Sequence, residues 1–187
     1  MELVKNYFAY MQNPTQALRK LLEESSFKQA CWGYFAAALS WVLFFNIGDE
    51  IGIPALLLKL LIVFVAEITL GIFIAAFSGL FLSFRGKSIS PAQLFVLVGS
   101  SGFIKGLLIA FALISAMWPR AELWMLAPAA MVLVFMLQLG YLTFALRRVR
   151  GIPLSVGLLS WLFGIVPVGM LFCLLGIFVF WVILLMV

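Results

Sequence analysis

The chain has 187 residues, of which 66% are hydrophobic and only 10% are charged, and its formal net charge is +5. Soluble domains have about 45–50% apolar and about 25% charged residues, so this composition excludes a water-soluble enzyme, a disordered tail and a disulfide scaffold. The mean hydropathy of +1.22 supports the same conclusion. In a membrane protein a positive net charge first indicates topology, and no basic stripe with interleaved aromatic residues predicts a nucleic-acid partner.

Residues 1–29 differ from the rest of the chain and predict a cytoplasmic amphipathic segment. Asn13 and Pro14 place a capping side chain before a proline at the first helical position. After Pro14, apolar side chains share one helical face, while Arg19 and Lys20 lie elsewhere. Such a helix lies in the inner headgroup layer, where Arg19 and Lys20 would contact anionic lipid, or it packs against the cytoplasmic ends of the bundle. The sequence leaves both arrangements open.

Residues 30–187 contain apolar stretches long enough to cross the hydrocarbon core, which needs about 20 residues for roughly 30 Å. These stretches show no alternation of apolar and polar residues, so they predict helices rather than a membrane barrel. The expected fold class is therefore all-α, a polytopic integral membrane protein. The five predicted transmembrane helices cover about residues 30–47, 55–84, 94–118, 123–146 and 154–187.

The last predicted span is too long for a simple crossing, because a helix over 154–187 would measure roughly 51 Å. Pro167 lies inside it, flanked by Gly164 and Gly169, and a proline there kinks or breaks a helix. A tilted helix with a kink at Pro167 is one interpretation. A re-entrant hairpin that turns at Gly164–Gly169, returning the C-terminus to the cytoplasm, is the other.

Basic residues are distributed unequally between the two sides of the predicted bundle. One side collects nine bases and the other only Arg120: the nine are Lys5, Arg19, Lys20, Lys28, Arg85, Lys87, Arg147, Arg148 and Arg150. Because bases stay in the cytoplasm, this asymmetry predicts a cytoplasmic N-terminus in the inner (plasma) membrane. The stretch Arg147–Gly151 is expected to be a short connection between the fourth and fifth spans.

Two charged residues fall at mid-depth in the predicted spans, where a charge costs about 3 kcal/mol on insertion scales. Glu67 and Lys105 both lie about 16–18 Å from the residues where their spans enter the membrane. Since consecutive antiparallel helices are neighbours, we expect the two side chains to face each other. A structural ion pair and a substrate or ion pathway both explain them, and the sequence also allows Lys105 to snorkel without meeting Glu67.

Small residues predict where the spans approach each other closely. Gly99, Gly102 and Gly106 form such a stripe in the third span, and Gly71 and Gly79 form one in the second. Gln138 and Tyr141 in the fourth span are candidate inter-helix hydrogen bonders, and Cys31 and Cys173 are expected to be small buried hydrophobes.

No catalytic or cofactor-binding pattern is present in the sequence. Histidine is absent, so serine nucleophiles lack their usual base and metals lack their commonest ligand. The two cysteines are far apart, and no phosphate-binding loop occurs. We therefore expect a non-enzymatic protein without cofactor or metal.

In its layout the chain resembles the prokaryotic branch of the Yip-one domain family, whose eukaryotic members interact with Ypt/Rab-type GTPases. The resemblance covers nearly the whole chain: Asn13-Pro14 followed by a hydrophobic face, the Gly/Ser-rich stretch Gly99–Gly102, and the exit of the fourth span from Tyr141 to Arg147. It implies a multi-span membrane protein with a cytoplasmic N-terminal helix. The third span lacks the family's tyrosine–proline pair, so no GTPase-binding residue is carried over.

Two functions from different classes follow from these patterns. The first is a membrane-organising scaffold or accessory subunit, whose partners are the lipid bilayer and other membrane proteins or further copies of itself. The alternative is a small transporter or channel component that uses Glu67 and Lys105. A water-accessible cavity that reaches Glu67, or a proton- or ion-dependent flux abolished by Glu67→Gln, would favour the alternative, and a dry, tightly packed core around Glu67 would count against it.

Overall fold

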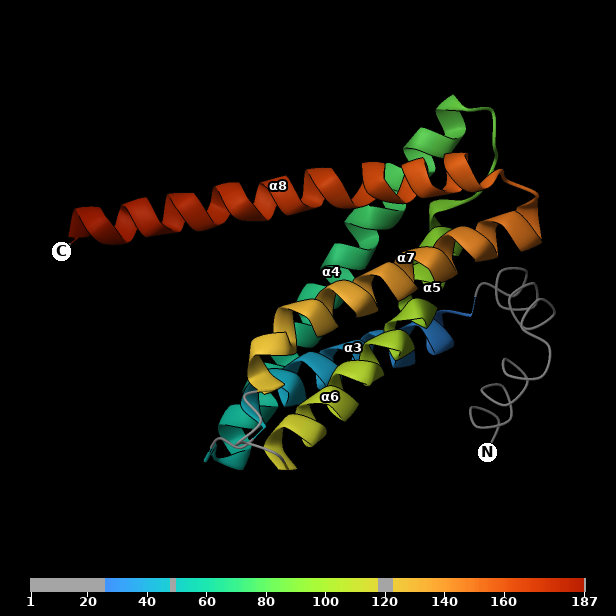
Figure 1. Ribbon diagram of the computed structural model, residues 1–187. Coiled ribbons are helices and arrows are strands. Elements are labelled where there is room, and N and C mark those ends of the chain that lie inside the picture. Colours follow the sequence, from blue (N-terminus) through green and yellow to red (C-terminus); the bar gives the residue numbers. More distant parts are fainter. Residues whose placement is uncertain (1–25, 48–49, 118–122, 187) are drawn as a thin grey trace.

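The computed structural model describes residues 26–47, 50–117 and 123–186. These residues form helices joined by short connections, without any strand (Figure 1). The predicted amphipathic segment at 1–29, including Arg19 and Lys20, lies almost wholly outside the described residues. Its position at a membrane surface therefore stays a prediction.

The described part of the chain is a bundle of helices interrupted by two short 3₁₀ turns. In chain order the elements are α3 (Phe27–Asn46), α4 (Ile53–Phe84), α5 (Pro91–Ser101), the turn η1 (Gly102–Lys105), α6 (Gly106–Met117), the turn η3 (Leu123–Leu126), α7 (Ala127–Arg150) and α8 (Leu154–Met186). Local signals explain several boundaries. Pro91 stands at the start of α5, where Ser90 accepts a hydrogen bond from the Gln93 backbone N–H at 3.2 Å.

Among the described residues, four helices are long and apolar enough to cross a membrane, which makes the chain a candidate multi-pass membrane protein. They are Ile53–Phe84, Pro91–Met117, Ala127–Arg150 and Leu154–Leu171. The first predicted span, at 30–47, coincides with α3, which has 20 residues but is not one of the four. Polar side chains such as Gln29 and Asn46 make α3 less apolar than its neighbours. The count of five spans is therefore not confirmed.

Helix α3 packs against α4, α5, η1 and α6. One of its faces is buried almost completely, from Ala30 and Tyr34 to Phe44. Small residues on this face allow the neighbouring backbones to approach closely. Other positions of α3, among them Phe27, Trp32 and Phe45, are exposed, so neighbouring helices cover only part of its surface.

The outer faces of α4, α7 and α8 expose large apolar side chains, among them Leu57, Leu133 and Leu174. Lipid tails are as apolar as leucine, so exposure of this kind is the normal state of a membrane bundle.

Cys31 and Cys173 also lie on exposed faces, and the expectation that both are buried is wrong. A small apolar thiol is stable against lipid as well as in a core, so its chemistry alone does not indicate which it will face.

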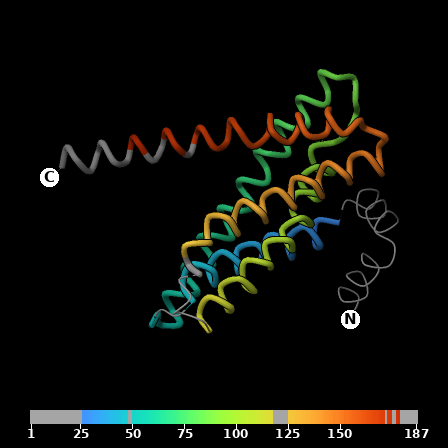
Figure 2. Tube along the Cα trace, in the orientation of Figure 1, coloured from blue at the N-terminus to red at the C-terminus, as the bar shows by residue number. Residues whose placement is uncertain are grey.

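Helix α8 is continuous from Leu154 to Met186, with Pro167 inside it. It crosses α4 and then extends beyond the other helices without reversing direction (Figures 1 and 2). The re-entrant hairpin is therefore excluded, while the kink at Pro167 stays a prediction.

The crossing of α8 and α4 is close because Gly164 has no side chain: a Cβ there would lie 2.3 Å from Ser78 Oγ. Ser78 Oγ also donates a hydrogen bond to the Ser160 carbonyl at 2.9 Å.

One end of the bundle gathers the basic side chains. Arg147, Arg148 and Arg150 belong to the last turn of α7, so the expectation of a loop over Arg147–Gly151 is wrong. Cations at a helix C-terminus are favourable, because the free carbonyl groups give that end a partial negative charge. Gly151 then ends the helix in the left-handed conformation, with φ of 63°. Arg150 Nη2 donates to Gln93 Oε1 at 3.0 Å, which joins this end of α7 to the start of α5.

Candidate functional site

Two apolar clusters fill the bundle, and a layer of polar side chains lies between them. Along α3 the buried side chains pass from Tyr34 in the first cluster to Phe44 in the second. Along α5, η1 and α6 they pass from Leu97 to Leu108 in the same order. Between these positions lie the polar side chains of Ser40 and Ser101, together with the ion pair of Glu67 and Lys105.

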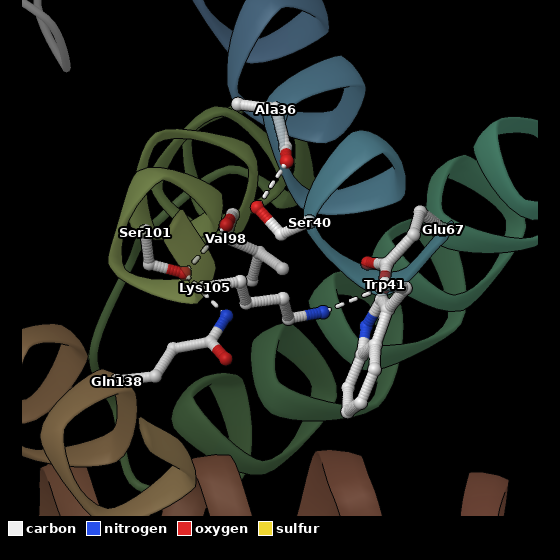
Figure 3. A network of polar contacts seen from close by, with 8 residues as sticks. All are labelled: Ala36, Ser40, Trp41, Glu67, Val98, Ser101, Lys105 and Gln138. Carbon is white, nitrogen blue, oxygen red and sulfur yellow. Dashed lines mark hydrogen bonds and ion pairs between the residues drawn. The ribbon is translucent and has the colours of Figure 1, made fainter. Parts of the chain in front are cut away.

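Glu67 on α4 and Lys105 at the end of η1 form an ion pair. Lys105 Nζ lies 2.6 Å from Glu67 Oε1, and the two side chains are only 14% and 11% exposed respectively. Trp41 on α3 donates its indole N–H to the same oxygen at 2.9 Å. The lysine ammonium also lies 5.6 Å from the centre of the Trp41 ring, within range of a cation–π interaction. Figure 3 shows Lys105 reaching from its turn toward Glu67 and Trp41.

The 3₁₀ turn directs Lys105 toward α3 and α4. In this kind of helix residues i and i+3 eclipse each other, so Lys105 lies on the same face as Gly102. Gly102 faces α3 at very short range, since a Cβ there would lie 2.3 Å from the Gly33 carbonyl oxygen. The lysine is therefore carried on the face that meets α3, where Trp41 is available.

Gln138 on α7 brings a fourth helix to this polar layer. Its Nε2 donates to Ser101 Oγ at 2.7 Å, and Ser101 Oγ donates in turn to the Val98 carbonyl at 2.6 Å. This is the inter-helix hydrogen bond that the sequence indicates for Gln138. Figure 3 shows the amide of Gln138 directed toward Ser101 and Lys105.

A cavity of about 370 Å³ lies beside the ion pair. Its polar lining comes from Tyr34, Trp41, Glu67, Lys105 and Gln138, and all its other lining residues are apolar or glycine. Ligand pockets in proteins have about 300–1,000 Å³ and the same combination of apolar walls with a few convergent polar groups. Among the described residues, no group of three or more His, Cys, Asp or Glu side chains could hold a metal ion.

Some glycines of the predicted small-residue stripes lie at close contacts between helices, and others do not. A Cβ at Gly99 would lie 2.7 Å from the Tyr34 ring, and one at Gly71 would lie 2.0 Å from the Tyr34 hydroxyl. At Gly79 a Cβ would make ordinary contacts, and at Gly106 it would meet open space. Gly102 is thus a close contact and Gly106 is not, although the sequence places both in one GxxxG motif.

Gly33 and Trp41 make contacts beside the ion pair that the sequence analysis did not predict, and both lie on α3. Gly33 stands four residues before Ala37 and three after Ala30, so it belongs to a small-residue stripe that could have indicated it. Trp41 carries an N–H in the middle of an apolar stretch, and a buried indole N–H usually finds an acceptor. That requirement could have linked it to Glu67, the only carboxylate at the same depth in the predicted spans.

Replacing Trp41 by phenylalanine is expected to lower stability by about 1 kcal/mol, because it removes the indole donor to Glu67 and keeps an aromatic ring. The measurement is the midpoint of thermal unfolding of the purified protein in detergent. Trp32 is half-exposed on the same helix and makes no hydrogen bond to Glu67, so Trp32→Phe is the matched control. Equal midpoints for the two variants would show that the hydrogen bond contributes nothing.

Comparison of the chain with protein-family models, with curated proteins and with solved structures finds no match in any of the three. The cavity and its ion pair are therefore interpreted from their own geometry. The arrangement can bind a small molecule or ion at mid-depth in an apolar bundle.

Proposed function

We propose that the protein is a non-enzymatic transporter or channel component whose cargo occupies the cavity beside Glu67 and Lys105. The observation that supports this function is the cavity of about 370 Å³ that reaches both members of the ion pair. A purely structural pair would be stable in a dry, packed core. Intramembrane charges that border a cavity are typical of substrate and ion pathways.

The proposed architecture has five spans, with α3 as the fifth. A helix of 20 residues is about 30 Å long, which matches the hydrocarbon core. Its lower apolarity is consistent with a span that neighbouring helices shield from lipid on one face. The basic end of the bundle, with Arg147 and Arg148, would face the cytoplasm in the inner (plasma) membrane, and the N-terminus would lie on the same side.

Glu67→Gln is expected to abolish a proton or sodium flux, because the variant removes the one buried carboxylate that borders the cavity. The measurement is the decay of an imposed proton or sodium gradient across liposomes that contain the purified protein. The matched control is Glu50→Gln, which changes an exposed carboxylate outside the cavity. Equal fluxes through the wild type and Glu67→Gln, at equal amounts of monodisperse protein, would contradict the proposal.

A scaffold or accessory subunit is the second candidate, and α8 favours it. The C-terminal part of this helix extends past the other helices (Figure 2). Leu174, Ile177 and Phe178 on this part are exposed. The resemblance to the Yip-one domain family supports the same role. A chain that ends at Leu171 would then lose the membrane proteins that purify with the full chain, while keeping the fluxes of the wild type.

A further inference from the structure

The cavity opens sideways, between α4 and α7. Both helices line it, yet they hardly touch each other, because α4 packs mainly on α3, α5 and α8 while α7 packs mainly on α8. On the α7 side its lining includes Val132 and Phe135, which are 57% and 40% exposed. These two side chains are thus exposed as well as part of the lining, so the cavity is open on this side of α7. The opening therefore faces the apolar phase that surrounds the bundle.

The floor of the cavity is polar but carries no net charge. The Lys105 ammonium balances the Glu67 carboxylate, and both donors to that carboxylate use Oε1. Within the described part of the chain, the other carboxylate oxygen, Glu67 Oε2, accepts no hydrogen bond. Gln138 donates from Nε2 to Ser101, and among the described residues no donor reaches its Oε1. Two acceptor oxygens and an ammonium group are thus available to a molecule that enters.

We propose that this cavity binds the head of a neutral, hydroxyl-bearing amphiphile that enters from the bilayer between α4 and α7. This inference concerns the cavity of the proposed function and adds an amphiphile as a second occupant beside the transported ion, so it does not depend on the flux. A hydroxyl group donates one hydrogen bond and accepts others, which suits a floor of oxygen acceptors and an ammonium donor. A charged head would add an uncompensated charge to a balanced pair in an apolar bundle, and that is unfavourable.

The size of the cavity suits a head group with the first part of its chain. At about 30 Å³ per atom, the share of liquid volume taken by a water molecule, it holds about a dozen non-hydrogen atoms. The rest of an alkyl chain would leave through the opening and lie in lipid against Val132 and Phe135. The apolar walls of the cavity match such a chain.

The test compares three photo-crosslinking probes with the same alkyl chain and the same diazirine near the head: hexadecanol, hexadecyl sulfonate and hexadecylammonium. The full chain is reconstituted in lipid nanodiscs and irradiated with each probe, and mass spectrometry locates the labels. We expect the alcohol to label the cavity-lining residues of α4 and α7 about tenfold more than either charged probe, since an uncompensated charge at this depth is costly.

Charge variants sharpen the comparison. Glu67→Gln leaves the Lys105 ammonium without its carboxylate, so the sulfonate should become the best-bound probe. Lys105→Met leaves the carboxylate unpaired, so the ammonium probe should gain instead. Glu50→Gln, outside the cavity, should leave the preference for the alcohol unchanged.

Variants at the opening keep the test valid if the charge variants do not fold. Val132→Trp fills the mouth of the cavity and should remove most of the alcohol labelling. Leu133→Trp is the matched control, because Leu133 is equally exposed on α7 and does not line the cavity. Labelling that is equal for all three probes, or that Val132→Trp leaves unchanged, would overturn the inference. The proposed function is tested separately by the Glu67-dependent flux, so either one can fail without the other.

Discussion

Alanine in place of Glu67 alone or Lys105 alone is expected to cost about 3–5 kcal/mol of stability, because each change leaves the other charge buried without a partner. Replacing both, as Glu67→Leu with Lys105→Met, should recover most of that loss, since an apolar pair of similar volume removes both charges from the interior. The measurement is the midpoint of thermal unfolding in detergent, together with the monodisperse fraction on size exclusion. Glu67→Gln should lose less than Glu67→Ala, because its oxygen can still accept the Trp41 hydrogen bond.

Lys59→Ala is the control for the ion-pair variants. Lys59 Nζ donates to Asn46 Oδ1 at 2.5 Å on the exposed surface, so its loss should change the midpoint little. A double variant as unstable as the sum of the two single variants would mean that Glu67 and Lys105 do not stabilise each other.

Gly33→Ala is expected to destabilise the protein by about 3 kcal/mol, because the added methyl group overpacks a backbone contact that has no room to relax. A Cβ at Gly33 would lie 1.9 Å from the Gly99 carbonyl oxygen, so α3 and α5 would have to separate. Gly102→Ala should act in the same direction through its contact with the Gly33 carbonyl. The readout is again the unfolding midpoint, with the yield of folded protein as a second measure.

Gly106→Ala provides the matched control for the glycine variants. Gly106 is the other member of the Gly102–Gly106 motif, but its Cβ would meet nothing within 4 Å. Alanine there should be neutral or stabilise the helix by about 0.5–1 kcal/mol. If Gly33→Ala and Gly106→Ala had the same effect, the close approach of α3 and α5 would not contribute to stability.

The sequence predicts the helices well because their signals are local. Their ends are less well predicted: Pro91 after a capping serine and Gly151 after a basic turn are local signals, but the predicted spans begin at 94 and end at 146. Counting residues from the membrane entry points also predicts that Glu67 and Lys105 reach the same depth, and the structure places their charged atoms together. The prediction of equal depth needs only the rise per residue of an α-helix and the order of the spans.

The cavity and the role of α3 could not be predicted in the same way. A cavity forms where two helices do not pack against each other, and no local sequence pattern in α4 or α7 predicts that these two helices diverge. The mean hydropathy of α3 does not indicate whether protein or lipid surrounds it. The GxxxG motif likewise does not show that only Gly102 meets a neighbouring helix, because the turn η1 changes the face on which Gly106 lies.

The winding of η1 couples the electrostatics of the site to the geometry of the third predicted span. A 3₁₀ helix advances about 120° and 2.0 Å per residue, against about 100° and 1.5 Å in an α-helix. If Gly102–Lys105 relaxed to regular α-helical winding, Lys105 would rotate by roughly 80° relative to α5, and the segment would shorten by about 2 Å. The ammonium would then swing away from Glu67, so separation of the two charges and a screw-like shift of α6 would be a single motion.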